Sequence, residues 1–190
     1  MRPAFDHLSK STGGIFMSKM IRVDMTTLKV NVGAVPEKYA GLGGRSLTSN
    51  FVNDEVKPTC HALGKNNKII FAPGLLSGTS APNSGRISVG AKSPLTGTIK
   101  ESNSGGSFSQ KMARLGIKAL VIEGFADGDK FYVLKIDKNG PVLDEAPAEI
   151  VGGCGNYEAI RFLSEKYGSN VGIAIVGPAG EYRLPTANIS

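Results

Sequence analysis

Short apolar runs, each bounded by Gly, Pro, Asn or Asp, recur along this 190-residue sequence. Runs of this length between turn residues are typical of β-strands, because strands in folded domains are short and end where the backbone must turn. The pattern predicts strands over residues 20–24, 29–32, 68–72, 86–91, 119–123, 131–136 and 171–176.

Longer segments with a helical spacing of apolar residues lie between these strands. They predict helices over residues 46–52, 107–115 and 157–167. In the second helix Phe108, Met112 and Leu115 fall on one face, and Gly116 follows as a stop signal, since glycine readily takes the left-handed conformation that ends helices.

In the third predicted helix Ile160, Leu163 and Tyr167 share a face, and Gly168 is the expected C-terminal cap. Strands and helices alternate irregularly, which predicts an α+β fold with mixed or antiparallel β-sheets and a few short helices.

IIFAPG at 69–74 and IAIVGPAG at 173–180 both look like an apolar strand followed by a Pro/Gly turn. The similarity of these two segments leaves open whether the chain consists of two similar halves.

Composition favours one folded domain. Hydrophobic residues make up 41% and charged residues 20% of the chain, as in ordinary globular proteins. The net charge of +6 comes from scattered Lys and Arg without a long basic run, so we expect no nucleic-acid partner. No signal peptide and no apolar run near eighteen residues is evident, so we expect a cytoplasmic protein without a membrane partner. Residues 1–17 are expected to be a disordered leader, and 18–190 the domain.

Candidate catalytic groups are few. Cys60 and Cys154 lie far apart and outside any C-x-x-C motif, so the sequence encodes no zinc site and no self-contained iron–sulfur site. His61 in a loop is expected to be solvated. Asp54 and Glu55 are interpreted as the polar end of a helix, with nothing nearby to shift their pKa values. The sequence therefore offers a binding surface and lacks a reaction centre.

The segment from Pro73 to Phe108 is unusually rich in Gly, Ser, Thr and Asn. Glycines let backbone N–H groups converge on an anion, and short polar side chains add further donors. Two turns, at 84–86 and 103–106, would bring Arg86 and Asn103 to one surface, where a helix N-terminus at residues 105–107 adds to an anion site. Taken singly, the arginine is as well explained by solvation and NSGG by a hairpin turn.

Six motifs, taken together, resemble the amino-terminal domain of the aldehyde:ferredoxin oxidoreductase family. In chain order they are IRVDMTT at 21–27, GGRSL at 43–47, NNKIIFAPGLLSGTSAPNSGR at 66–86, KSPLTG at 92–97, SNSGG at 102–106 and GPAGE at 177–181.

The resemblance implies a domain that binds a bis-pyranopterin cofactor carrying tungsten, or molybdenum in some relatives. By motif matching, Arg86, Asn103 and Gly105 correspond to pterin-contacting residues, Gly106 completes the SNSGG nest, and Lys92 is placed by KSPLTG alone. The implied enzyme oxidises small aldehydes to carboxylic acids and passes electrons through a 4Fe–4S cluster to ferredoxin. The cluster ligands are not in this chain.

Family sequences continue past this chain into domains that supply the cluster cysteines and the substrate pocket. The resemblance therefore implies partnership with the C-terminal domains of the same enzyme or with a partner subunit, and an isolated chain without aldehyde oxidation. Homodimerisation is left open. The alternative is a non-catalytic scaffold of the same fold that binds no pterin. The convergence of Arg86, Asn103 and Gly105 on one surface distinguishes the two readings.

Overall fold

The structure, a computed structural model, describes residues 17–184 and 187–190. A six-stranded sheet has the order β2-β1-β6-β3-β4-β5, and β7 and β8 form a separate hairpin. β1 and β6 run parallel, and the other neighbours are antiparallel. The strands are β1 (Lys19–Asp24), β2 (Lys29–Ala34), β3 (Lys68–Pro73), β4 (Ile87–Lys92), β5 (Ile99–Ser104), β6 (Ile117–Glu123), β7 (Tyr132–Asp137) and β8 (Gly140–Glu145). The predicted α+β class with mixed sheets is confirmed.

Most of the expected leader at 1–17 lies outside the described residues. Its last residue, Met17, is described and is buried. The backbone that follows is bound to the sheet, because the amides of Ser18 and Lys19 both donate to the Gly116 carbonyl.

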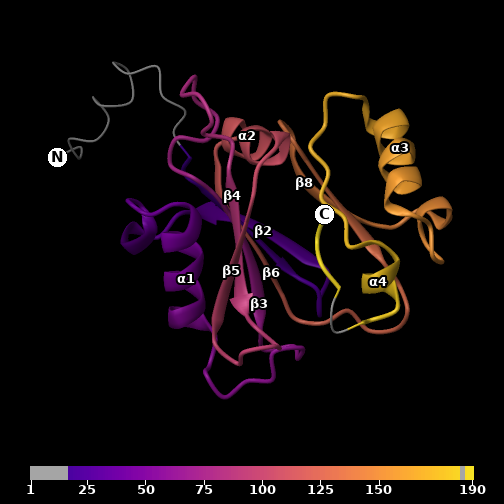
Figure 1. The fold of residues 1–190 in the computed structure, drawn as a ribbon, viewed down its shortest axis with the longest axis horizontal. Helices are drawn as coiled ribbons and strands as arrows, with labels where there is room; N and C mark the ends of the chain where they lie inside the picture. Colours follow the sequence, from indigo (N-terminus) through magenta and orange to yellow (C-terminus); the bar gives the residue numbers. More distant parts are fainter. Residues whose placement is uncertain (1–16, 185–186) are drawn as a thin grey trace.

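Each face of the six-stranded sheet is covered by different elements (Figure 1). Helix α1 (Gly44–Glu55) packs on one face, where Leu47 and Phe51 are fully buried against strand residues such as Ile70. Helix α2 (Ser107–Arg114) and the β7–β8 hairpin cover the other face, around Phe71. Helices α3 (Asn156–Tyr167) and α4 (Gly177–Glu181) lie beyond that hairpin, on the side away from α1.

The chain uses the same series of elements twice. Strands β1 and β2 have six residues each, followed by a three-residue 3-10 helix, η2 (Glu37–Tyr39), and by the twelve-residue α1. Strands β7 and β8, the 3-10 helix η3 (Ala148–Ile150) and α3 repeat these lengths. Pro36 and Pro147 precede the two 3-10 helices with nearly equal dihedral angles, φ −55° and ψ 142° against φ −58° and ψ 143°. This repetition supports two similar halves.

Six of the predicted strands are confirmed to within about two residues, and the strand at 171–176 is wrong. In the first half, β3 is hydrogen-bonded on both sides, by β6 and β4. In the described part of the second half, only Ile175 within 171–176 makes backbone hydrogen bonds, to Ser190. Strands β5 and β8 were missed because both are largely exposed edge strands, without an apolar run.

The three predicted helices are confirmed, although α1 begins and ends outside its predicted bounds, and α4 was missed. Gly116 and Gly168 take positive φ as expected. The predicted face of the third helix is partly wrong, since Ile160 is exposed and the buried positions are Ala159 and Leu163. Ala159 carries the contact because a small side chain lets the helix approach its neighbours closely.

Gly90 of β4 lies against α1 so closely that we expect it to be sensitive to substitution. A Cβ built on Gly90 would lie 2.6 Å from Cβ of Thr48. We expect Gly90→Ala to lower the free energy of unfolding by about 1–3 kcal/mol, because a packed interface must open to admit the methyl group. Gly33→Ala in β2 is the control, since a Cβ there meets no atom within 4 Å. Equal urea midpoints for the two variants would contradict the close contact.

Candidate functional site

Arg86 and Asn103 lie together at one end of the β4–β5 pair. Arg86 immediately precedes β4, and Asn103 is near the end of β5, paired in register with Ser88. Arg86 Nε donates to Asn103 Oδ1 at 2.5 Å, and Asn103 Nδ2 donates to Ser88 Oγ at 3.1 Å. These bonds fix the guanidinium through its Nε and leave both η nitrogens for a ligand, within the described residues.

Gly105 and Gly106 form the turn from β5 into α2. A Cβ on Gly105 would lie 3.5 Å from Arg86 Nη1, so this backbone passes directly beside the guanidinium. Gly106 has φ 112°, and a Cβ there would meet open space. No side chain in the described residues caps α2, so the first N–H groups of the helix have no side-chain acceptor there. NSGG is therefore a strand-to-helix turn, and the hairpin alternative is wrong.

Two buried serines hold the loop that delivers Arg86. Ser77 Oγ lies 2.7 Å from the Ser84 carbonyl oxygen, and Ser109 Oγ of α2 lies 2.7 Å from that of Arg86. The two hydroxyls are 2.9 Å apart. Sequence reasoning missed both residues, although a serine one position after Phe108 on an amphipathic helix marks a buried polar position.

Lys92 is not brought to this cluster. It is at the far end of β4, and its Nζ donates to the Cys60 carbonyl at 2.7 Å and also to the carbonyl of Pro58. The lysine thus holds the loop that follows α1. Its assignment to a cofactor stays a prediction.

The cluster fits an anionic, phosphate-bearing group. Arg86 offers a fixed fork of donors, Gly105 and Gly106 leave the backbone open, and α2 contributes the positive end of its dipole. Both Arg86 and Asn103 are exposed, so an approaching ligand meets no side-chain barrier. The arrangement can bind and orient an anion. It contains no nucleophile or general base.

The comparisons with known proteins decide the family. Residues 20–190 match the family described as "Aldehyde ferredoxin oxidoreductase, N-terminal domain". The chain belongs to this family. It is 37% identical to the tungsten-containing aldehyde ferredoxin oxidoreductase of Pyrococcus horikoshii over 177 residues, and 38% identical to that of Pyrococcus furiosus over 174 residues. These alignments cover 92% and 90% of this chain and 28% of each relative.

A solved structure has the same fold. The active site complex BamBC of benzoyl coenzyme A reductase, in complex with 1,5-dienoyl-CoA, superposes with a TM-score of 0.83 at 24% identity. The match covers 93% of this chain and 27% of the other. At that identity the likeness establishes the fold of this aldehyde ferredoxin oxidoreductase domain and nothing about its ligand.

A cleft lies mostly on the other face of the sheet. It has a volume of about 920 Å³ and lies between strand residues such as Phe71 and Val89 and C-terminal residues such as Ile173 and Ile189. Its lining includes Asn103, Gly105 and Gly106, so the cleft adjoins the cluster, but Arg86 is absent from it. The cleft is mainly apolar, with Lys68, Lys92 and Lys100 among its lining residues. We take the Arg86 surface as the candidate site because its guanidinium is fixed beside the open Gly105–Gly106 turn.

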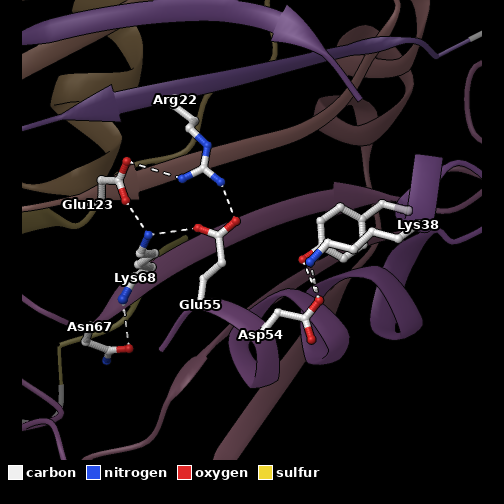
Figure 2. Close-up of polar contacts among 8 residues, drawn as sticks. Arg22, Lys38, Asp54, Glu55, Asn67, Lys68 and Glu123 are labelled. Carbon is white, nitrogen blue, oxygen red and sulfur yellow. Dashed lines mark hydrogen bonds and ion pairs between the residues drawn. The ribbon is translucent and has the colours of Figure 1, made fainter. Parts of the chain in front are cut away.

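Four charged side chains form a ring at the end of the sheet opposite to Arg86 (Figure 2). Arg22 contacts Glu55 at 2.5 Å and Glu123 at 3.5 Å, while Lys68 contacts Glu55 at 2.9 Å and Glu123 at 2.5 Å. Each charge thus has two opposite neighbours. With its charges matched in this way, the ring ties α1 to β1, β3 and β6 and offers no free group for chemistry.

The expectation that nothing shifts the pKa values of Asp54 and Glu55 is wrong. Hydrogen bonds from Lys38 and Tyr39 lower the pKa of Asp54 (Figure 2). Burial raises the pKa of Glu55, but hydrogen bonds from its two cationic partners lower it more, so its net pKa lies below 4.5. The partners were invisible in the sequence because they come from distant segments.

Metal-ligating residues do not gather in the described part of the chain. No three of its His, Cys, Asp and Glu side chains could share a metal ion, and Cys60 and Cys154 are free thiols. Across 17–184 and 187–190, no helix is long and apolar enough to cross a membrane.

The charge ring predicts a pH-dependent loss of stability. Since the pKa of Glu55 is lowered on folding, its contribution is present above about pH 4.5 and is lost as the pH falls through the folded-state pKa. We expect Glu55→Gln to cost about 1–2 kcal/mol at pH 7 and less at pH 3, measured by urea unfolding. Glu149→Gln, an exposed site with no ion pair among the described residues, should be neutral at both. An equal cost for Glu55→Gln at pH 7 and at pH 3 would contradict the ionic origin.

The serine pair predicts a local effect at the loop. We expect Ser109→Ala to cost on the order of 1 kcal/mol and to speed hydrogen exchange of the Gly74 amide, which donates to the Arg86 carbonyl. Ser107→Ala, at an exposed position of the same helix, is the control. Unchanged exchange at Gly74 in the Ser109 variant would show that the serines do not hold the loop.

Proposed function

We propose that this domain holds the bis-pyranopterin tungsten cofactor of an oxidoreductase that converts aldehydes to carboxylic acids with ferredoxin as electron acceptor. The observation that carries the proposal is the Arg86–Asn103 pair beside the open Gly105–Gly106 turn. The names of the Pyrococcus relatives support the tungsten and the aldehyde chemistry.

Each residue of the cluster has a role in binding. Arg86 binds a phosphate oxygen of the cofactor through its η nitrogens, and Asn103 fixes the guanidinium in that direction. Gly105 and Gly106 let the cofactor approach the backbone, whose amides lead into the free N-terminus of α2. When bound, the cofactor supplies a redox-active metal for two-electron oxidation. The domain supplies position and charge.

The remaining functions belong to other parts of the enzyme. The chain spans 28% of the length of the two relatives, and its described residues form no metal cluster. We therefore assign the 4Fe–4S cluster, the aldehyde pocket and the ferredoxin contact to further domains or a partner subunit, acting in the cytoplasm. The domain alone is expected to be inactive.

Pterin retention in the assembled enzyme tests the proposal. We expect Arg86→Ala to lose most of the tungsten and pterin, measured by elemental mass spectrometry and by fluorescence of the oxidised pterin. Asn103→Ala should lose less, because it removes only the anchor of the guanidinium. Arg161→Ala, an exposed arginine paired with Glu165 on α3, is the control. A pterin-free parent protein would favour the scaffold alternative, whereas full retention in both the Arg86 and the Asn103 variant would show that this cluster does not hold the cofactor.

A further inference from the structure

A second arginine is built into the same surface in the same way as Arg86. Arg45, in the first turn of α1, donates from its Nε to Glu101 Oε2 at 2.9 Å. Arg86 donates from its Nε to Asn103. Within 17–184 and 187–190, no protein acceptor engages the η nitrogens of Arg45. Each guanidinium is thus fixed through Nε with its fork left open.

The two anchors are neighbours on one face of one strand. Glu101 and Asn103 are two residues apart on β5, so both side chains point to the face covered by α1. In register they lie opposite Gly90 and Ser88 of β4. Residues at this spacing are about 7 Å apart along a strand. The two anchors thus hold both arginines at the same face of the sheet, one strand repeat apart at the anchors.

The Arg45–Glu101 pair is unlike the other exposed ion pairs of the domain. The Glu101 side chain is 8% exposed while that of Arg45 is 75% exposed. In the pairs Lys130–Glu145 and Arg161–Glu165 both partners are more than half exposed. Burying a carboxylate is costly, so a buried anchor under an exposed guanidinium indicates that the direction of Arg45 matters.

Glu101 depends on this arrangement to stay charged. Burial raises its pKa, and Ser88, Arg45 and Asn103 together lower it below its ordinary value. Its Oε1 is buried without a hydrogen-bond partner in the described residues. Ser88 and Asn103, which help to lower this pKa, also belong to the chain of bonds that holds Arg86, so the two arginines share polar neighbours.

We propose that Arg45, held by Glu101, is a second phosphate-binding arm of the cofactor surface, so that Arg45 and Arg86 together grip a diphosphate-type group. This inference rests on the proposed function for the identity of the ligand. Arg86 alone would bind one phosphoryl group, whereas the pair would bind two linked phosphoryl groups, one at each guanidinium. Glu101 is a positioning residue and does not touch the ligand.

Inorganic pyrophosphate is the probe for this clamp. In the full chain labelled with ¹⁵N, we expect pyrophosphate to shift the side-chain Nε–H signals of both Arg45 and Arg86 with one common Kd. The Arg161 signal should not move. Inorganic phosphate should bind at least about tenfold more weakly, because it fills one fork only. Equal affinities for the two anions, or equal shifts with chloride, would overturn the clamp.

Variants separate the clamp from a structural role. We expect Arg45→Lys, which keeps the charge but loses the fork, and Glu101→Gln, which weakens the anchor, each to raise the pyrophosphate Kd about tenfold. A lowered Tm with an unchanged Kd in Arg45→Lys would show a structural role only and overturn the inference. A response at Arg86 without one at Arg45 would overturn the clamp and leave the proposed function standing. If neither the Arg45 nor the Arg86 signal responds to pyrophosphate, the result contradicts the clamp and the proposed function alike.

Discussion

The close contact between helix α1 and strand β4 is the constraint on which the site depends. Gly90 has no room for a side chain because Thr48 occupies that space. The contact lets α1 lie flat against the β4–β5 edge, and this brings Arg45 within hydrogen-bonding distance of Glu101. A helix held even one side-chain layer farther away could not share its first turn with that strand. The fold thus sets the site through packing between apolar and small residues.

A second set of contacts turns an edge strand into a binding surface. Strand β5 is exposed along most of its length, and an open edge invites pairing with other chains. Here charged and polar side chains, Glu101 and Asn103, are bonded to arginines from other elements. Ser77 and Ser109 fix the loop that carries one of those arginines. These side-chain bonds cover one face of the edge strand, and they also orient the N–H donors of Arg45 and Arg86.

Local signals in the sequence were enough for six of the described strands and for helices α1, α2 and α3, and they predicted that Arg86 and Asn103 share one surface. The segment 171–176 misled because its apolar pattern matches that of β3, while a strand also needs bonded neighbours. Glu101 and Arg45 escaped notice for a related reason. They are 56 positions apart, and neither is unusual in its local context until the fold pairs them. Partners contributed by distant segments are what short-range patterns cannot supply.

The two similar halves of the described chain differ at the positions that carry the arginine pair. In both halves the helix start packs on the turn after the next apolar segment: Gly44 on Gly74, and Asn156 on Gly177. The second helical position, however, is Arg45 in α1 and Tyr157 in α3. Within the described residues, the second half also has no edge strand equivalent to β5 to anchor an arginine. The shared contacts explain the common scaffold, and the arginines with their anchors explain why we assign anion binding to the first half.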